Sequence, residues 1–150
     1  MNVEGVRVEG VRVLEIKLHN ETIGHLLGFQ NGKNLFTFAE SFKTTPQRPT
    51  FGLITSVQFP NAAKLLNETW IRNQRLHPVL SNLLPEGALR SLVAQQLKIH
   101  PDQEFELLAA LGKDLPGAVQ AVFVNILVRL NLILRLFSVY FSPQLYWGLK

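Results

Sequence analysis

The sequence predicts an α+β domain in which a small antiparallel sheet of about five strands packs with three short helices. Side chains between Val13 and Phe59 alternate in polarity over several short runs, as they do in strands that bury one face. After Pro60 the apolar residues recur at helical spacing, and residues 117–124 return as a strand that rejoins the sheet. A chain of 150 residues fits one such domain, which we place at residues 13–124.

The first two strands come directly after one another. Leu14, Ile16 and Leu18 share one face of the first strand, because every second residue of a strand points the same way. Residues 19–21 have turn chemistry, and the second strand then runs to Phe29. We therefore expect a meander with one buried face.

The next segment supplies two further strands. The pair Asn31-Gly32 tolerates positive φ and indicates a hairpin, after which residues 35–39 return as the third strand. Residues 41–51 contain two prolines and are predicted as a loop. Residues 52–59 alternate again and are predicted as the fourth strand.

Prolines divide the helical part of the chain. Pro78 can open a short helix, Pro85 forces a break, and Pro101 suits the first turn of a third helix that ends near Gly112. Acidic residues favour the positive N-terminal end of that third helix. The second helix is expected to bury the apolar residues that recur at helical spacing along it, namely Leu89, Leu92, Val93 and Leu97.

The composition limits the functional classes. The chain has no cysteine, which excludes disulfides and thiolate metal sites and makes the cytoplasm the expected location. Fifteen Lys and Arg against eleven Asp and Glu give a modest formal charge of +4, spread along the chain, which supports nucleic-acid binding only weakly. Glu4 and Glu9 interrupt the N-terminus, so no signal peptide is expected.

Both ends of the chain differ from the domain. Residues 1–12 contain a short tandem repeat that is too short for a solenoid, and we assign no site to it. Residues 125–150 form an apolar tail interrupted by Arg129 and Arg135. Each central Arg costs about 2.5–3.5 kcal/mol on the insertion scale, which makes a membrane helix marginal. A terminal helix or a frameshifted end explains the tail more simply.

No catalytic, cofactor or metal site can be assembled from the sequence, so we expect a protein that is not an enzyme. The four histidines lack the i, i+4 spacing of a zinc helix. Five glycines lie in strand or hairpin contexts without a following helix N-terminus or the lysine of a phosphate-binding loop, namely Gly5, Gly10, Gly24, Gly28 and Gly32. Glu86 is explained by a helix N-terminus and Asp114 by a turn.

A binding role is easier to locate. Trp70 lies in a polar stretch flanked by cations, where it either caps the core or forms an interface hot spot. We therefore predict that Trp70, Arg72 and Arg75 bind a partner protein. The wider set of cations is either solvated surface or a nucleic-acid footprint, and consists of Lys64, Arg72, Arg75, Arg90 and Lys98.

Residues 77–120 carry a pattern that one protein family shares. Its most specific signs are Asn82-Leu83-Leu84-Pro85-Glu86-Gly87, Arg90, Gly112-Lys113-Asp114 and Gly117-Ala118-Val119-Gln120. The pattern resembles the N-terminal subdomain of HipA-type serine/threonine kinase toxins, and the resemblance covers about Val13 to Gln120.

The resemblance implies an accessory protein of a toxin–antitoxin system. Full-length members are kinases that pair with a helix-turn-helix antitoxin, and their first subdomain packs on the kinase core without supplying catalytic residues. In three-gene variants a separate small protein resembles this subdomain and neutralises a shortened kinase. We therefore expect a HipS-like antitoxin that docks on a HipA-like kinase toxin in trans, with a repressor, and through it DNA, as a further partner.

Two alternatives stay open. The chain could be a truncated or frameshifted fragment of a HipA-family kinase without activity of its own, or a DNA-binding regulator. A neighbouring gene for a kinase core that lacks its own first subdomain favours the antitoxin, whereas kinase sequence resuming in another reading frame favours the fragment.

Overall fold

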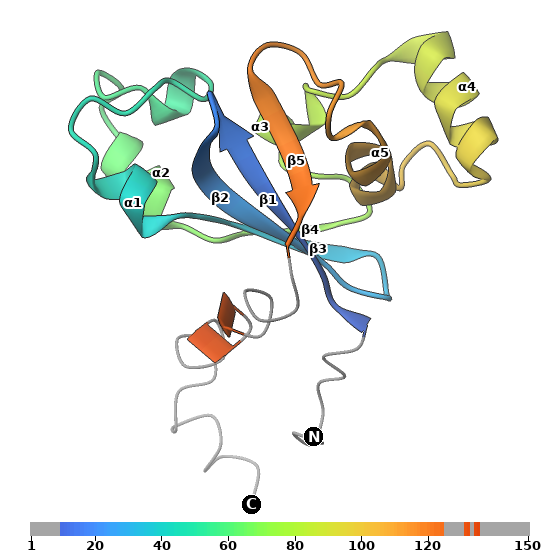
Figure 1. The fold of residues 1–150 in the computed structure, drawn as a ribbon, viewed down its shortest axis with the longest axis horizontal. Helices are drawn as coiled ribbons and strands as arrows, with labels where there is room; N and C mark the ends of the chain where they lie inside the picture. The colour runs from blue at the N-terminus through green and yellow to red at the C-terminus, as the bar shows by residue number, and fades with distance from the viewer. Residues whose placement is uncertain (1–9, 125–130, 133, 136–150) are drawn as a thin grey trace, which may run out of the picture.

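The sheet is five-stranded, antiparallel and ordered β4-β3-β2-β1-β5 (Figure 1). The computed structural model describes residues 10–124, 131, 132, 134 and 135. The predicted α+β class is confirmed, and the strands are β1 Arg12–Leu18, β2 Glu21–Gly28, β3 Lys33–Phe38, β4 Trp70–Asn73 and β5 Val119–Phe123.

The meander of the first three strands is confirmed close to its predicted bounds. His19 and Asn20 form the first turn with φ of 50° and 65°, the left-handed region in which Asn is tolerated well. Gly32, with φ of 82°, forms the second turn, where a side chain would also collide with Gln74. The first turn joins β1 to β2, and after a register shift between Ile16 and Lys17, Val13 lies opposite Leu27 on the neighbouring strand.

The last strand closes the sheet against the first. β5 pairs antiparallel with β1, with Leu18 opposite Val119 and Leu14 opposite Phe123. The predicted fifth strand is therefore confirmed, and β1 lies between β2 and β5.

Five α-helices and one short 3-10 turn cover one face of the sheet within the described residues. They are α1 Glu40–Thr44, η2 Leu53–Thr55, α2 Ala62–Asn67, α3 Pro78–Ser81, α4 Gly87–Leu97 and α5 Glu104–Leu111. The three predicted helices correspond to α3, α4 and α5. All five helices contribute to one buried cluster with the inner face of the sheet, for example through Phe42 of α1 and Leu107 of α5.

Two predictions between β3 and β4 are wrong. Residues 52–59 are not a strand, because the hydroxyl of Thr55 accepts a hydrogen bond from the Phe51 N–H (2.8 Å) and donates one to the Gly52 carbonyl (2.9 Å). These bonds hold a local turn and leave Leu53 exposed. The predicted loop at 41–51 also contains most of α1. The fourth strand is instead Trp70–Asn73, which pairs with β3.

The orientation of α4 also differs from the prediction. Its buried residue is Ala94, with Arg90 and Val93 half-buried beside it, while Leu89 and Leu92 are 57% and 53% exposed. The helix turns this way because Arg90 reaches inward to a buried carboxylate on α5. In Figure 1, α4 lies at the outer margin of the helical layer.

The opposite face of the sheet carries a smaller apolar cluster. Val11, Val13 and Leu27 are buried there, and partly buried Leu35 and Leu132 pack against them. The predicted apolar tail lies mostly outside the described residues, as does most of the tandem repeat. Among the described residues, no helix is both long and apolar enough for a membrane crossing.

Candidate partner-binding surface

Trp70 is a core residue of the edge strand β4. Its side chain is only 6% exposed, and its ring lies 5.0 Å from Phe38 in an edge-to-face arrangement and 5.4 Å from Phe36. Strand alternation explains this position, because Trp70 points to the helical side of the sheet and Ile71 points to the other. Of the two sequence-based interpretations of Trp70, the structure places it in the core.

His77 covers the other side of the Trp70 ring. The two rings are stacked, with centroids 3.7 Å apart and planes 17° from parallel. The Nδ1 atom of His77 also accepts a hydrogen bond from the Val79 N–H (3.3 Å) at the start of α3. Burial lowers the pKa of His77, and the positive charge of Arg72 lowers it further. A neutral imidazole is the form that can act as this acceptor.

Arg72 and Arg75 both reach the surface, but they differ in their partners. Arg75 donates from Nε (3.0 Å) and Nη2 (2.7 Å) to Oδ1 of Asp102, which ties the end of β4 to the loop before α5. Arg72 forms no ion pair with another described residue. Of the predicted binding residues, the structure therefore leaves Arg72 as the cation free to meet a partner, and the binding role of all three stays a prediction.

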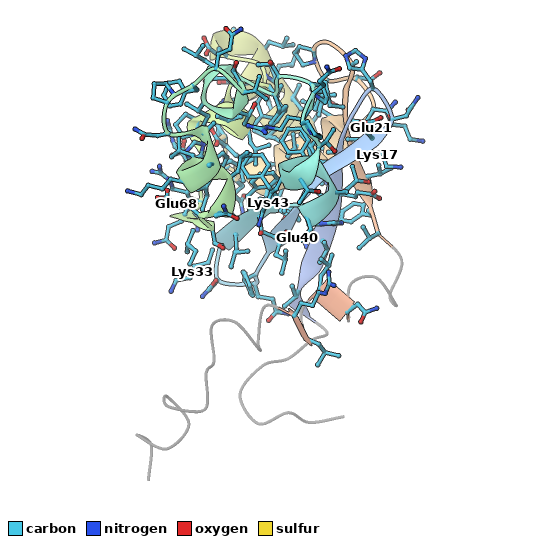
Figure 2. All side chains as sticks on the ribbon, turned by 90° about the vertical axis from the view of Figure 1, so that its left-hand side faces the viewer. Lys17, Glu21, Lys33, Glu40, Lys43 and Glu68 are labelled. Carbon is cyan, nitrogen blue, oxygen red and sulfur yellow. The ribbon has the colours of Figure 1, made fainter. Side chains whose placement is uncertain are left out.

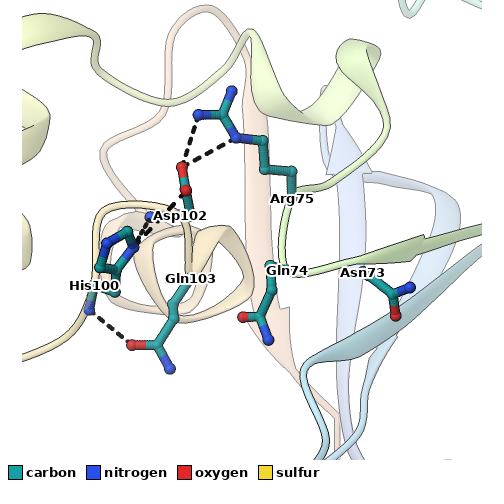
Figure 3. Close-up of a pocket in the computed structure, with 6 residues that line it drawn as sticks. All are labelled: Asn73, Gln74, Arg75, His100, Asp102 and Gln103. Carbon is teal, nitrogen blue, oxygen red and sulfur yellow. Dashed lines mark hydrogen bonds and ion pairs between the residues drawn. The ribbon is translucent and has the colours of Figure 1, made fainter.

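A shallow depression lies beside Arg75 (Figure 3). Asn73, Gln74, Arg75, His100, Asp102 and Gln103 line it. The His100 N–H donates to Oε1 of Gln103 (2.8 Å), and the Asp102 N–H donates to Nδ1 of His100 (3.1 Å). The lining residues supply polar groups and both signs of charge, but no hydroxyl, thiol or lysine nucleophile. The depression suits polar contacts with another surface better than covalent catalysis.

A buried ionic cluster holds the helices together beneath this surface. The Glu104 carboxylate is 0% exposed and accepts hydrogen bonds from the Leu76 N–H (2.7 Å), the Ser81 hydroxyl (2.8 Å) and Nη1 of Arg90 (2.8 Å). The Nε of Arg90 donates to the Pro85 carbonyl (2.8 Å). Leu76 lies between β4 and α3, Ser81 lies at the end of α3, and Arg90 lies on α4. The cluster therefore fixes α3, α4 and α5 relative to β4.

Sequence reasoning missed the role of Glu104 and Arg90. The acid fits the N-terminal turn of α5 as predicted, but its burial depends on groups 14 to 28 residues away. The signal that could have found the pair is Arg90 itself, which lies in an otherwise uncharged helix within the motif of residues 82–90. Glu86 occupies the N-cap position of α4 without a side-chain cap, and Asp114 lies in a turn, in line with their sequence-based interpretation.

The predicted set of cations does not form one patch. Arg90 is directed inward to Glu104, and Arg75 is paired with Asp102. Elsewhere, both signs of charge share the same surface: Figure 2 shows Lys17, Lys33 and Lys43 interspersed with Glu21, Glu40 and Glu68. A nucleic-acid footprint normally concentrates positive charge on one face, and these six residues do not form one.

A second hollow is lined by residues of β1, β2 and β3 and by Glu40, Ser41 and Lys43 of α1. Its lining includes Glu15, Thr22, His25 and Thr37, and the Thr22 hydroxyl donates to the Glu15 carboxylate. Burial lowers the pKa of His25, opposed by the charge of Glu15. Within the described residues, no group of three His, Cys, Asp or Glu side chains is placed to hold a metal ion.

Comparison with known proteins shows which family the sheet and its helices belong to. Residues 14–122, from β1 to β5, match the family model of the HipA N-terminal domain. "Putative kinase Y4dM" of Sinorhizobium fredii is 40% identical over 109 residues, which cover 73% of this chain and 26% of that protein. "Putative kinase Y4mE" of the same organism is 29% identical over 110 residues, covering 73% and 24%. The chain thus spans about a quarter of the length of these curated relatives.

Proposed function

Because the chain belongs to the HipA N-terminal domain family, we propose that it is a protein-binding domain that docks on the kinase core of a HipA-type toxin. We further propose that it does so in trans and inhibits the kinase, which would make it an antitoxin. On this proposal the chain has no phosphotransfer activity of its own.

One observation carries the proposal: the family-matched segment forms a closed unit. β5 returns to pair with β1, and all five helices share one buried cluster with the inner face of the sheet. A segment that encloses its own core can fold apart from the rest of a kinase and act as a separate binding partner. The relatives named as kinases carry the same segment on a chain about four times as long, which supplies the surface it would dock on.

The alternative of a kinase fragment is supported by the same relatives. In that case the domain would dock on a kinase core of its own chain, through the same surface, and would not inhibit it. The DNA-binding alternative is less favoured by the structure, since two of its five predicted cations, Arg75 and Arg90, are tied up in ion pairs.

Binding to a kinase core tests the proposal. The probe is Y4dM shortened to the part that follows its HipA N-terminal segment. We expect the full 150-residue chain to form a stable complex with this core, seen by size-exclusion chromatography and titration calorimetry. Full-length Y4dM is the matched control, because on this proposal its own matching segment already covers the docking surface. We expect the core to bind at least about tenfold more tightly than the full-length protein.

Inhibition is measured separately. Co-expression of the chain should restore the growth of cells that are arrested by the kinase core. Absence of a complex with the core overturns the docking proposal. A complex that leaves growth arrest and kinase activity unchanged overturns the antitoxin role and favours the fragment.

A further inference from the structure

The outer edge of β4 has free hydrogen-bonding groups. β4 is the last strand on its side of the sheet, and its register places Lys33 opposite Asn73 and Leu35 opposite Ile71. The Gln74 N–H donates to the Gly32 carbonyl (2.9 Å), which continues this register by one residue pair. In an antiparallel ladder, hydrogen-bonded pairs alternate with non-hydrogen-bonded pairs. Arg72 is therefore bonded to β3, whereas Ile71 and Asn73 direct their backbone groups outward.

The pairing of β3 with β2 gives the same result independently. The Phe29 N–H donates to the Lys33 carbonyl (2.9 Å) and the Ala39 N–H to the Ile23 carbonyl (2.9 Å), so the odd-numbered residues of β3 bond toward β2. Leu35, opposite Ile71, is one of them. Among the described residues, no hydrogen bond occupies the outward N–H and C=O of Ile71 or the N–H of Asn73, while the Asn73 carbonyl accepts from Arg75.

The side chain at this edge is also unusual. Ile71 is 58% exposed, and it continues a row of apolar side chains across the face of the sheet opposite α1 to α5, formed by Val13, Leu27 and Leu35. Proteins commonly protect an exposed edge strand with a charge, a proline or a bulge at such a position. β4 is short and carries Arg72 on its other face, but on this face it has only Ile71 and Asn73 and no charge, and an exposed sheet edge can accept an additional strand.

We propose that β4 is a strand-addition site, whose outer edge pairs with an extended segment of the kinase core. This inference rests on the proposed function and names the part of the surface that would carry it. The added strand places an apolar side chain beside Ile71, extending the apolar row by one strand. It places a carboxylate beside Arg72, which has no acidic partner among the described residues.

Charge favours this occupant over a second copy of the chain. If two copies paired edge to edge around Ile71, each Arg72 would lie opposite Trp70 of the other copy and diagonal to its Arg72, on the same face of the joined sheet. Long side chains reach each other at such diagonal positions, so the two like charges would repel. An acidic strand instead neutralises Arg72.

Amide hydrogen exchange of the full chain, free and bound to the Y4dM kinase core, tests the site. In the free chain the Arg72 amide should exchange slowly because it is bonded to β3, while the Ile71 and Asn73 amides exchange fast. On binding, the Ile71 and Asn73 amides should slow by about a hundredfold or more, since they become part of a ladder. A complex in which both amides stay fast overturns strand addition but leaves docking intact, and absence of any complex overturns both.

Two variants separate the backbone from the side chain. Ile71→Pro removes the outward N–H, and proline is tolerated on edge strands where that N–H faces solvent. Ile71→Lys introduces an edge charge that discourages pairing. Each should weaken binding by about tenfold or more, the range of a central interface contact. Leu89→Lys is the matched control, since Leu89 is 57% exposed on α4, and it should bind within about twofold of wild type.

Folding and self-association are checked alongside. Both Ile71 variants must melt cooperatively; should Ile71→Pro not fold, Ile71→Lys and the exchange experiment still decide the outcome. Concentration-dependent protection of Ile71 in the free chain, together with a dimer in sedimentation, would show that the edge pairs with a second copy and would overturn the proposed occupant.

Discussion

The indole of Trp70 and the imidazole of His77 are stacked 3.7 Å apart, which joins the edge strand of the sheet to the first turn of α3. One side of the indole is thus covered by a helix cap and its other neighbours are Phe36 and Phe38. We expect Trp70→Ala to destabilise the domain by about 3–5 kcal/mol, as is usual when a large buried aromatic is truncated. Urea unfolding followed by circular dichroism measures this.

If Trp70→Ala loses kinase binding, its loss of stability must be measured as well, because an unfolded variant cannot bind. Trp70→Phe is the control, because it keeps an aromatic ring in the cluster and should retain most of the stability. A Trp70→Ala protein that unfolds at the wild-type urea concentration would contradict the core assignment and return Trp70 to the surface.

Stability should fall as the pH decreases below the ordinary pKa of histidine, 6.5. Burial lowers the folded-state pKa of His77 and of His25, so just below that pH the unfolded chain binds protons that the folded chain does not. The contribution of both groups is present above that value and is lost as the pH falls toward their lower folded-state pKa. Urea midpoints at about pH 7.5 and about pH 5.5 should show the decrease.

His77→Asn tests how much His77 contributes to the pH dependence of stability. Asn can still cap α3 but does not titrate in this range, so the variant should lose less stability on acidification than wild type. An unchanged dependence on pH would show that His77 does not contribute to it.

The buried pair of Arg90 and Glu104 should be sensitive to removal of the cation alone. Arg90→Met leaves the fully buried Glu104 carboxylate without its cation, and we expect a cost of about 3–5 kcal/mol in the free energy of unfolding. Adding Glu104→Gln to this variant should restore part of the loss, because it removes the buried charge and keeps an acceptor.

Arg75→Met provides the comparison. It removes an ion pair with Asp102 in which the side chains are 66% and 42% exposed, and it should cost at most about 1 kcal/mol. Equal costs for Arg75→Met and Arg90→Met would contradict the assigned difference in burial.

Gly112 should not tolerate a side chain. A Cβ atom there would lie 2.0 Å from the carbonyl oxygen of Ala121, and the Gly112 carbonyl accepts a hydrogen bond from the Ala121 N–H (2.8 Å). Gly112→Ala must therefore push α5 away from β5, and we expect a loss of at least about 2 kcal/mol. Gly117→Ala is the control. The φ of Gly117 is 72°, but a Cβ atom added there would have no atom of another residue within 4 Å, so only backbone strain of about 1–2 kcal/mol is expected. Thermal melts rank the two variants, and the opposite order would argue against the contact.

The purified chain should neither bind ATP nor transfer phosphate. Its sequence has no glycine-rich loop that leads into a helix with a phosphate-binding lysine, the arrangement that cradles nucleotide phosphates. Calorimetric titration with Mg-ATP and a radiolabel transfer assay measure both activities. Autophosphorylation above a no-protein control would contradict this prediction.

The sequence predicted the elements that local patterns determine. The strand pairs around the Asn31-Gly32 turn and the helix opened by Pro78 follow from residues within a few positions of each other. The strand predicted at residues 52–59 was wrong because alternating polarity over a short run also arises in turns. There the hydroxyl of Thr55 satisfies the backbone that a strand would have paired.

The candidate site was harder to predict because it depends on contacts between distant segments. β4 is only four residues long, and its pairing is decided by β3, some 37 residues earlier. The leucines of α4 are exposed because the helix turns Arg90 inward to bind Glu104. The spacing of apolar residues along α4 does not indicate this contact. The sequence left open whether Trp70 caps the core or lies in an interface, because its contacts Phe36 and His77 cannot be recognised from the residues beside it.

The pairing of β1 with β5 sets the order in which the domain can be completed during synthesis. β1 leaves the ribosome before every other strand of the sheet, but its partner on one side ends at Phe123, more than a hundred residues later. Until then β1 has an open edge on the side where β5 will lie, the kind of edge to which foreign strands attach. Closing such a distant contact is slow. A pause in translation soon after β5 has emerged would therefore raise the yield of correctly folded domain.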